Sequence, residues 1–347
     1  MDIRERLEAF WAGERPDEIP YTIYQNEWRH TASDPAWQAL YEMGLGVTWY
    51  ARPFKENHNG IEYIEETSTV DGLPFLKRII KTPVGEIYET FLDEWRQKFY
   101  LETAEDYAVM THVVRNTEVI PAIDTFIAKG NEIGKYGINI NFIGRTPNQI
   151  ILVDLVGLEN YAFHLFDLKA EMQELYNALL DNFRQRVQIA AECPGPYVSV
   201  LENFTADTMG PKRFKELLVP VYDECFPILH NAGKIVGTHY DGQLSACKEH
   251  IANAPIDLIE SLTPPPEGDM TLKEARAAWP DKLFWSNINV ELYYLPPEKL
   301  KKIVLERVEE AAPDGKRLAF EVSEQYPANW KESLPTVLEA LKETRAS

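Results

Sequence analysis

The chain has 347 residues, of which 45% are hydrophobic and 26% charged, a composition typical of a folded protein with one large core or two smaller ones. Its 55 acidic and 35 basic side chains give a formal net charge of −20, which argues against nucleic acid or an anionic membrane surface as a partner. Three cysteines without paired spacing, and no apolar run long enough for a signal peptide or membrane span, predict a cytoplasmic protein.

Strand patterns recur along the chain, with helical patterns between them. The predicted strands are residues 19–28, 46–54, 136–144, 197–204, 234–242, 256–262, 282–289 and 317–325. Eight strands alternating with helices, and no glycine-rich phosphate loop after any of them, predict an α/β fold, a (β/α)8 TIM barrel. An N-terminal helical extension precedes the first strand.

Within residues 73–95, two β-rich runs flank Pro83-Val84-Gly85, which predicts an inserted antiparallel β-hairpin. We therefore expect a single barrel domain over residues 1–347, with the hairpin insertion at about residues 60–100. Helical sequence resumes with Thr103 as N-cap and Asp106 three residues later. The loop at 263–275 contains three consecutive prolines, so we expect a rigid wall beside Glu260.

Polar side chains lie at the carboxyl ends of most of the predicted strands. In a TIM barrel the active site lies at the carboxyl ends of the strands. His239 and Asp241 are two residues apart in an extended segment, so both point to the same side. Several converging carboxylates are costly to bury unless a partner or a cation compensates them. His239 and Asp241, together with Glu260, Glu321 and Glu202 as a fifth candidate, make a nitrogen-and-oxygen ligand set suited to zinc or another divalent metal.

Each of these residues also has an interpretation without a metal. A histidine at a strand end commonly bonds a neighbouring carboxylate. Glu260 could be a buried acid paired with Arg52 or Lys234, and Asp241 with the glycine after it could simply form a turn. The spacing alone leaves both interpretations open.

Six stretches of the chain carry a family resemblance. They are IPYTIYQNEWRH, TPVGEIYE, GININFIGRTPNQIILVDLVGLENYAFHLFD, GTHYDGQL, LIESLTPPPEGDMTLKEA and LAFEVSEQYPANWKESLPTVLEAL. The series resembles the uroporphyrinogen decarboxylase superfamily over nearly the whole chain, and is closer to its corrinoid-dependent methyltransferase branch, of the O-demethylase methyltransferase I type. This resemblance also implies a (β/α)8 barrel.

The chain departs from both branches at the motifs that carry their chemistry. The decarboxylases have Arg-Gln-Ala-Gly-Arg at the first strand, where this chain has YQNEWRH and so lacks that anion clamp. Methyl-coenzyme M forming relatives bind zinc through His-x-Cys and a further Cys. His239 matches the histidine, whereas Asp241 and Glu321 stand where the cysteines would be. Oxygen ligands leave zinc a stronger Lewis acid, better suited to polarising an ether oxygen than to activating a thiol.

The resemblance therefore implies a methyltransferase component of an O-demethylase. It would transfer a methyl group from a methoxylated aromatic or other methylated small molecule to the cobalt of a partner corrinoid protein. The chain has no Asp-x-His-x-x-Gly corrinoid motif, so the corrinoid, which leaves as methylcobalamin, would be supplied by that partner. Zinc is the expected metal.

The expected roles follow from this resemblance. His239, Asp241, Glu260 and Glu321 would bind the metal, and Glu202 or Tyr240 would donate a proton to the leaving group. The expected substrate-binding residues are Tyr24, Asn26, Asn203 and Asn287. A decarboxylase-like enzyme acting on a small acid, and a non-catalytic barrel that binds a corrinoid or its partner, remain as alternatives. The oligomeric state is open, with a homodimer among the choices.

Overall fold

The computed structural model describes residues 1–24, 28, 33–322 and 326–344. The chain forms two compact units. The first comprises Met1–Pro53, Ala122–Gly144 and Ala190–Ser347, and the second comprises Phe54–Pro121 and Arg145–Ile189. The assignment of the whole chain to one domain stays a prediction.

The first unit is built around a closed barrel of eight parallel strands, in the order β1-β14-β13-β12-β11-β10-β9-β2. The strands are β1 (Tyr21–Tyr24), β2 (Leu45–Ala51), β9 (Gly137–Phe142), β10 (Tyr197–Val200), β11 (Ile235–His239), β12 (Leu258–Leu262), β13 (Leu283–Asn287) and β14 (Leu318–Glu321). Seven of the eight strands lie within strands predicted from the sequence, and β2 extends beyond its predicted strand by one residue, Leu45. The predicted (β/α)8 fold is confirmed.

The first helix of this unit precedes the first barrel strand in the chain, the last helix follows the last strand, and the others lie between strands. The helices are α1 (Ile3–Trp11), α3 (Pro35–Met43), α5 (Ile123–Ile133), α9 (Ala206–Arg213), α10 (Val219–Asn231), α11 (Lys248–Asn253), α12 (Leu272–Ala278), α13 (Pro297–Ala311) and α14 (Trp330–Glu343). Thr271 caps α12, and Glu274 completes the capping box. Asp269, two residues before Thr271, accepts backbone N–H bonds from Leu244 and Ser245, at 2.7 and 3.1 Å.

Helix α1 packs against the amino-terminal end of the barrel. A capping box between Asp2 and Glu5 begins the helix. Its apolar face forms one core cluster with the first inward-facing residues of the strands. Trp11 stacks on Tyr197 at 5.2 Å between ring centroids and meets Trp285 edge-on at 6.0 Å. Because apolar side chains fill the amino-terminal end of the barrel, the polar side chains of the interior lie toward its carboxyl-terminal end.

The register of the strands places those polar side chains in one layer. His239 lies opposite Glu260 across the β11–β12 pair. Glu321 lies opposite Asn287 on one side and Thr22 on the other. Residues paired in register point to the same side of a sheet. The carboxyl ends of these neighbouring strands therefore direct an imidazole, two carboxyls and an amide into the barrel.

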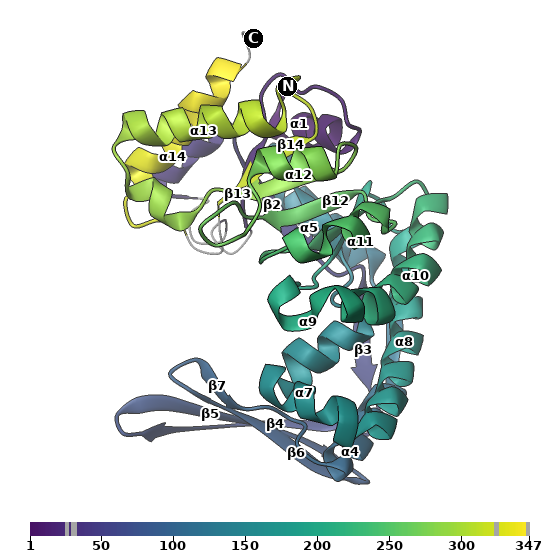
Figure 1. Cartoon of the computed structure of the whole chain (residues 1–347). Coiled ribbons are helices and arrows are strands. Elements are labelled where there is room, and N and C mark those ends of the chain that lie inside the picture. Colours follow the sequence, from purple (N-terminus) through teal and green to yellow (C-terminus); the bar gives the residue numbers. More distant parts are fainter. Residues whose placement is uncertain (25–27, 29–32, 323–325, 345–347) are drawn as a thin grey trace. The chain divides into compact units, whose positions relative to one another are not determined.

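The second unit contains two antiparallel sheets. The strands β3 (Phe54–His58) and β8 (Thr117–Pro121) pair with each other, whereas β4 (Glu62–Val70), β5 (Leu73–Thr82), β6 (Gly85–Leu92) and β7 (Trp95–Lys98) form a four-stranded sheet. Figure 1 shows these four strands side by side in one twisted sheet. The predicted hairpin is confirmed as β5 and β6, but the sequence did not indicate its neighbours β4 and β7, which are mostly polar and exposed.

Helices complete the second unit. They are α4 (Ala104–Arg115), α6 (Pro147–Gln149), the π-helical turn Ile150–Val156, α7 (Leu158–Asp167) and α8 (Lys169–Glu192), whose last residues belong to the first unit. Thr103 and Asp106 form the capping box of α4, as predicted. No helix among the described residues is long and apolar enough to cross a membrane.

We predict that Trp11→Ala destabilises the protein by about 3–5 kcal/mol, because it empties a buried aromatic site. Urea unfolding measures this loss. Trp95→Ala is the matched control, since Trp95 is 74% exposed whereas Trp11 is 3% exposed, and surface substitutions shift stability by about 0.5 kcal/mol or less. Equal losses in the free energy of unfolding for the two variants would show that the packing of α1 against the barrel does not stabilise the protein.

Candidate functional site

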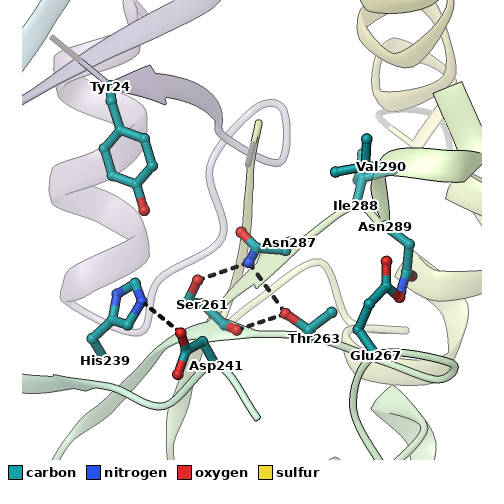
Figure 2. Close-up of a pocket in the computed structure, with 10 residues that line it drawn as sticks. All are labelled: Tyr24, His239, Asp241, Ser261, Thr263, Glu267, Asn287, Ile288, Asn289 and Val290. Carbon is teal, nitrogen blue, oxygen red and sulfur yellow. Dashed lines mark hydrogen bonds and ion pairs between the residues drawn. The ribbon is translucent and has the colours of Figure 1, made fainter. Parts of the chain in front are cut away.

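A cavity of about 300 Å³ lies at the carboxyl ends of the barrel strands. It is lined by Tyr24, His239, Asp241, Ser261, Thr263, Glu267, Asn287, Ile288, Asn289 and Val290. Figure 2 shows His239 beside Asp241, and the hydroxyl of Tyr24 pointing toward the side where His239 lies. This volume is suited to a small molecule, and most of the lining is polar.

His239 lies between two carboxylates. Its Nδ1 is 3.1 Å from Oε1 of Glu260, and its Nε2 is 3.6 Å from Oδ2 of Asp241. Burial lowers the pKa of His239, but hydrogen bonds and charge from the two carboxylates outweigh burial and raise that pKa to about 10. An imidazolium can donate from both nitrogens. In the absence of a metal, the ring is therefore a cation held by two anions.

Glu260 is 1% exposed, so its charge needs strong compensation. Its Oε2 accepts hydrogen bonds from Tyr197 Oη at 2.6 Å and Ser199 Oγ at 3.1 Å, both from β10. Burial raises the pKa of Glu260, and the bonds from His239, Tyr197 and Ser199 more than reverse that effect and lower it. A Cβ at Gly237 would lie 2.3 Å from Tyr197 Oη, so glycine is required there for the Tyr197–Glu260 bond.

The structure tests two parts of the interpretation without a metal. His239 is bonded to a neighbouring carboxylate, as the interpretation without a metal expected. Pairing of Glu260 with Lys234 is not observed, because the Lys234 ammonium instead donates to the carbonyls of Cys193 and Gly195.

Glu321 lies in the same layer but has a different environment. It is 1% exposed, and neither carboxyl oxygen has a hydrogen-bond partner among the described residues. Burial raises its pKa well above the usual value, and the negative charge of Glu260 raises it further, whereas His239 and the nearby Tyr24 hydroxyl oppose the rise. Glu321 is therefore held as a neutral acid by burial and by the charge of Glu260.

Asp241 and Ser261 owe their positions to local backbone geometry. Asn203, in the left-handed region at φ 47°, donates from Nδ2 to Asp241 Oδ2 at 3.2 Å. Burial raises the pKa of Asp241, but the bonds from His239 and Asn203 lower it overall. Ser261, at φ 62°, lies at a bulge where the β12–β13 register shifts, and its side chain lines the cavity. Such backbone strain is common at functional sites.

The remaining predicted residues lie elsewhere. Glu202 and Tyr240 are fully buried around Tyr222, whose hydroxyl donates to Glu202 Oε1 at 2.8 Å and lies 3.0 Å from the Tyr240 hydroxyl. Neither lines the cavity. Asn26 lies outside the described residues. The structure therefore places Tyr24, Asn287, His239 and Asp241 on the cavity, with Asn203, Glu260 and Glu321 behind or beside them.

The four predicted metal ligands occupy one region without already forming a ligand cluster. Among the described residues, no group of three His, Cys, Asp or Glu side chains is arranged to hold a metal ion. Their donor chemistry does fit a divalent cation, because the set offers one nitrogen and several oxygens. Among the residues that the structure describes, the carboxyl oxygens of Glu321 have no hydrogen-bond partner, so this donor set fits such an ion.

Several lining residues had no signal in the sequence strong enough to single them out. Ser261, Thr263 and Glu267 lie on β12 and the proline-rich loop after it. The loop was expected to form a wall, and it supplies Thr263 and Glu267 to the lining. Tyr197 and Ser199 were also missed, although their two-residue spacing on one strand could have placed both side chains inside the barrel.

We predict that His239 stays protonated at mildly alkaline pH in chelator-treated protein. Its raised pKa contributes stability that is fully present below the unfolded value near 6.5 and is lost as the pH rises through about 10. Imidazole ¹⁵N NMR against pH measures this directly. Glu260→Gln should lower the His239 pKa, because it removes one flanking charge. An imidazole that titrates near 6.5 in the wild type would contradict this geometry.

No protein-family model matches the chain, and no curated protein matches it significantly. Among solved structures, a methyltransferase from Methanosarcina mazei is 11% identical, with a TM-score of 0.58 over 100% of both chains. The IOLI protein, whose crystal structure contains a bound zinc atom, is 10% identical, with a TM-score of 0.41 over 94% of this chain and 98% of its own. This second similarity is too weak to show a shared fold. At such low identity the first comparison shows a similar fold, which includes the TIM barrel.

Proposed function

We propose that the protein is a metal-assisted methyltransferase that moves a methyl group from a methylated small molecule to the cobalt of a partner corrinoid protein. The observation that carries the proposal is Glu321, a buried acid in the same layer as His239 and Glu260 whose carboxyl oxygens have no hydrogen-bond partner among the described residues. The full-length fold similarity to a methyltransferase supports it, as does the family resemblance of the sequence.

The ligands of the metal would be His239, Glu260 and Glu321, with Asp241 as an alternative oxygen donor. To bind, His239 must lose a ring proton, and Glu321 must lose its acid proton, because both donate lone pairs as ligands. When bound, zinc would act as a Lewis acid on the ether or alcohol-type oxygen of the substrate. Glu260 would also keep its bonds from Tyr197 and Ser199, which hold its carboxylate in place.

The transfer itself breaks the bond between the methyl carbon and its oxygen. The oxygen keeps the bonding pair, and the methyl carbon bonds to cobalt(I) of the partner, which contributes its own electron pair. A proton must then reach the leaving oxygen. Among the described lining residues, Tyr24 offers a hydroxyl for this purpose. Glu202 and Tyr240, proposed from the sequence, would have to act through a relay, because they do not line the cavity.

One observation favours a second candidate, a metal-free acid–base enzyme acting on a small acid, as in decarboxylases. His239 is already held as an imidazolium between Glu260 and Asp241, which suits proton transfer without a metal. The anion clamp of the decarboxylases is absent from the first strand, so we place this candidate second. Metal content separates the two.

We predict that purified protein contains about one zinc ion per chain, the stoichiometry of a single catalytic site. His239→Ala should lose both the zinc and methyl transfer to cob(I)alamin. His230→Ala is the matched control. His230 is bonded to Asp257 at 2.9 Å and does not line the cavity, so this variant should keep the zinc and the activity. Elemental analysis and the cob(I)alamin absorbance provide the readouts. A metal-free enzyme with full activity would rule out the proposal.

We also predict that loading zinc at neutral pH releases about two protons per ion, one from His239 and one from Glu321, because ligands bind deprotonated. Calorimetry in buffers of different ionisation enthalpy counts the protons. Glu321→Gln should release about one proton fewer and bind zinc more weakly. Binding without proton release would place the ion away from these two residues.

A further inference from the structure

The strand β4 forms one edge of the four-stranded sheet in the second unit. Among the described strands it pairs with β5 alone. Eight of its nine residues are exposed, and Ile64 is half-buried. Its register with β5 is continuous, from Glu62 opposite Lys81 to Val70 opposite Leu73. A long, regular and exposed edge strand can accept a further strand through its backbone.

The two edges of this sheet differ. At the far edge, β7 has four residues, and the register between β6 and β7 shifts at Thr90 and Phe91. Short strands and bulges are devices that block further pairing at an edge. In contrast, β4 has nine residues, contains no proline and shows no register shift against β5. The edge at β4 therefore lacks these devices and is open to another strand.

The turn between β4 and β5 determines which backbone groups point outward. Asp71 and Gly72 form this turn with φ angles of 51° and 83°, as in a two-residue hairpin of type I′. The flanking residues Val70 and Leu73 then exchange hydrogen bonds, and every second residue of β4 before Val70 also bonds β5. The alternate residues direct their N–H and C=O groups away from the sheet. These are Tyr63, Glu65, Thr67 and Thr69.

The acidic side chains in the middle of β4 are paired within the sheet. Glu65 accepts a hydrogen bond from Arg78 Nε at 2.8 Å, and Glu66 Oε2 lies 3.9 Å from Lys77 Nζ. Like charges directly opposite each other destabilise a pair of strands. Because cations of β5 already pair with Glu65 and Glu66, an incoming strand fits best when it places neutral side chains opposite both.

A second copy of β4 meets this requirement when it runs antiparallel with Thr67 opposite Thr67. The outward N–H and C=O groups of the two copies then meet in register. The other facing pairs are Glu65 with Thr69, Glu66 with Ser68, and Ile64 with Val70. Threonine pairs and pairs of β-branched apolar residues are favourable across strands.

The neighbouring antiparallel registers are worse. Pairing centred on Glu66 would place this carboxylate opposite its own copy, and pairing centred on Ser68 would place Glu65 opposite Asp71. Both arrangements bring like charges together. Charge therefore selects the register that is centred on Thr67.

We propose that two copies of the chain associate through β4, in antiparallel pairing about a two-fold axis at Thr67. The two four-stranded sheets then form one sheet of eight strands. The partner that fits this edge is a second copy of the chain, and the inference does not depend on the proposed methyl transfer.

Cross-linking tests the register. Thr67→Cys should give a disulfide-linked dimer after oxidation with diamide, because Cα atoms in a hydrogen-bonded antiparallel pair are about 5.5 Å apart, within disulfide range. Thr69→Cys is the matched control on the same strand, since its two copies would lie more than about 10 Å apart. The native cysteines are buried. Non-reducing electrophoresis measures the dimer. Equal cross-linking of the two variants, or none with Thr67→Cys, overturns the proposal.

A charge exchange tests the same axis without a covalent bond. Thr67→Glu and Thr67→Lys should each dimerise about two- to fivefold more weakly than the wild type, because each places like charges opposite each other. An equimolar mixture of the two variants should recover the dimer. Sedimentation velocity measures all four samples. A wild-type chain that stays monomeric up to about 1 mM, the weak end of the affinity scale, or a mixture no more dimeric than its components, overturns the proposal.

Discussion

The buried carboxylate of Glu260 is the constraint on which the rest of this site depends. A charge with 1% exposure in a barrel interior is tolerable only when several donors surround it. Tyr197 and Ser199 on β10 and His239 on β11 supply them. That requirement fixes the His239 ring, requires glycine at position 237, and leaves Glu321 to respond to the same negative charge.

The charges in this layer follow from one another. Asp241 and Glu260 hold a proton on His239 by raising its pKa, and burial together with the charge of Glu260 holds a proton on Glu321. The protons on His239 and Glu321 together carry two positive charges. A divalent cation that displaced both protons would carry the same charge. The proposal of a metal and the observed hydrogen bonds therefore describe two states of one set of residues. The cavity beside them differs, because the carboxylates of Asp241 and Glu267 line it.

The sequence was sufficient to predict the barrel because each strand pattern is bounded by helical sequence, and the hairpin because two β-rich runs flank a turn. It did not indicate β4 and β7, whose exposed polar residues lack the alternation that a buried face produces. His239, Asp241 and Asn287 were found because they end strands. The roles of Tyr197 and Ser261 depend on which strand lies beside which and on a bulge, and neither is visible in a single sequence. Glu202 and Tyr240 also end strands, but their side chains pack around Tyr222 instead of lining the cavity.

The central claim is that His239 and Glu321 bind one divalent ion at the carboxyl end of the barrel. X-ray absorption at the zinc edge of the loaded protein tests it most directly. We predict a first shell of one imidazole nitrogen with carboxylate or water oxygens and no sulfur, and loss of the imidazole signature in His239→Ala. A sulfur ligand, or a zinc spectrum unchanged by that substitution, would contradict the account.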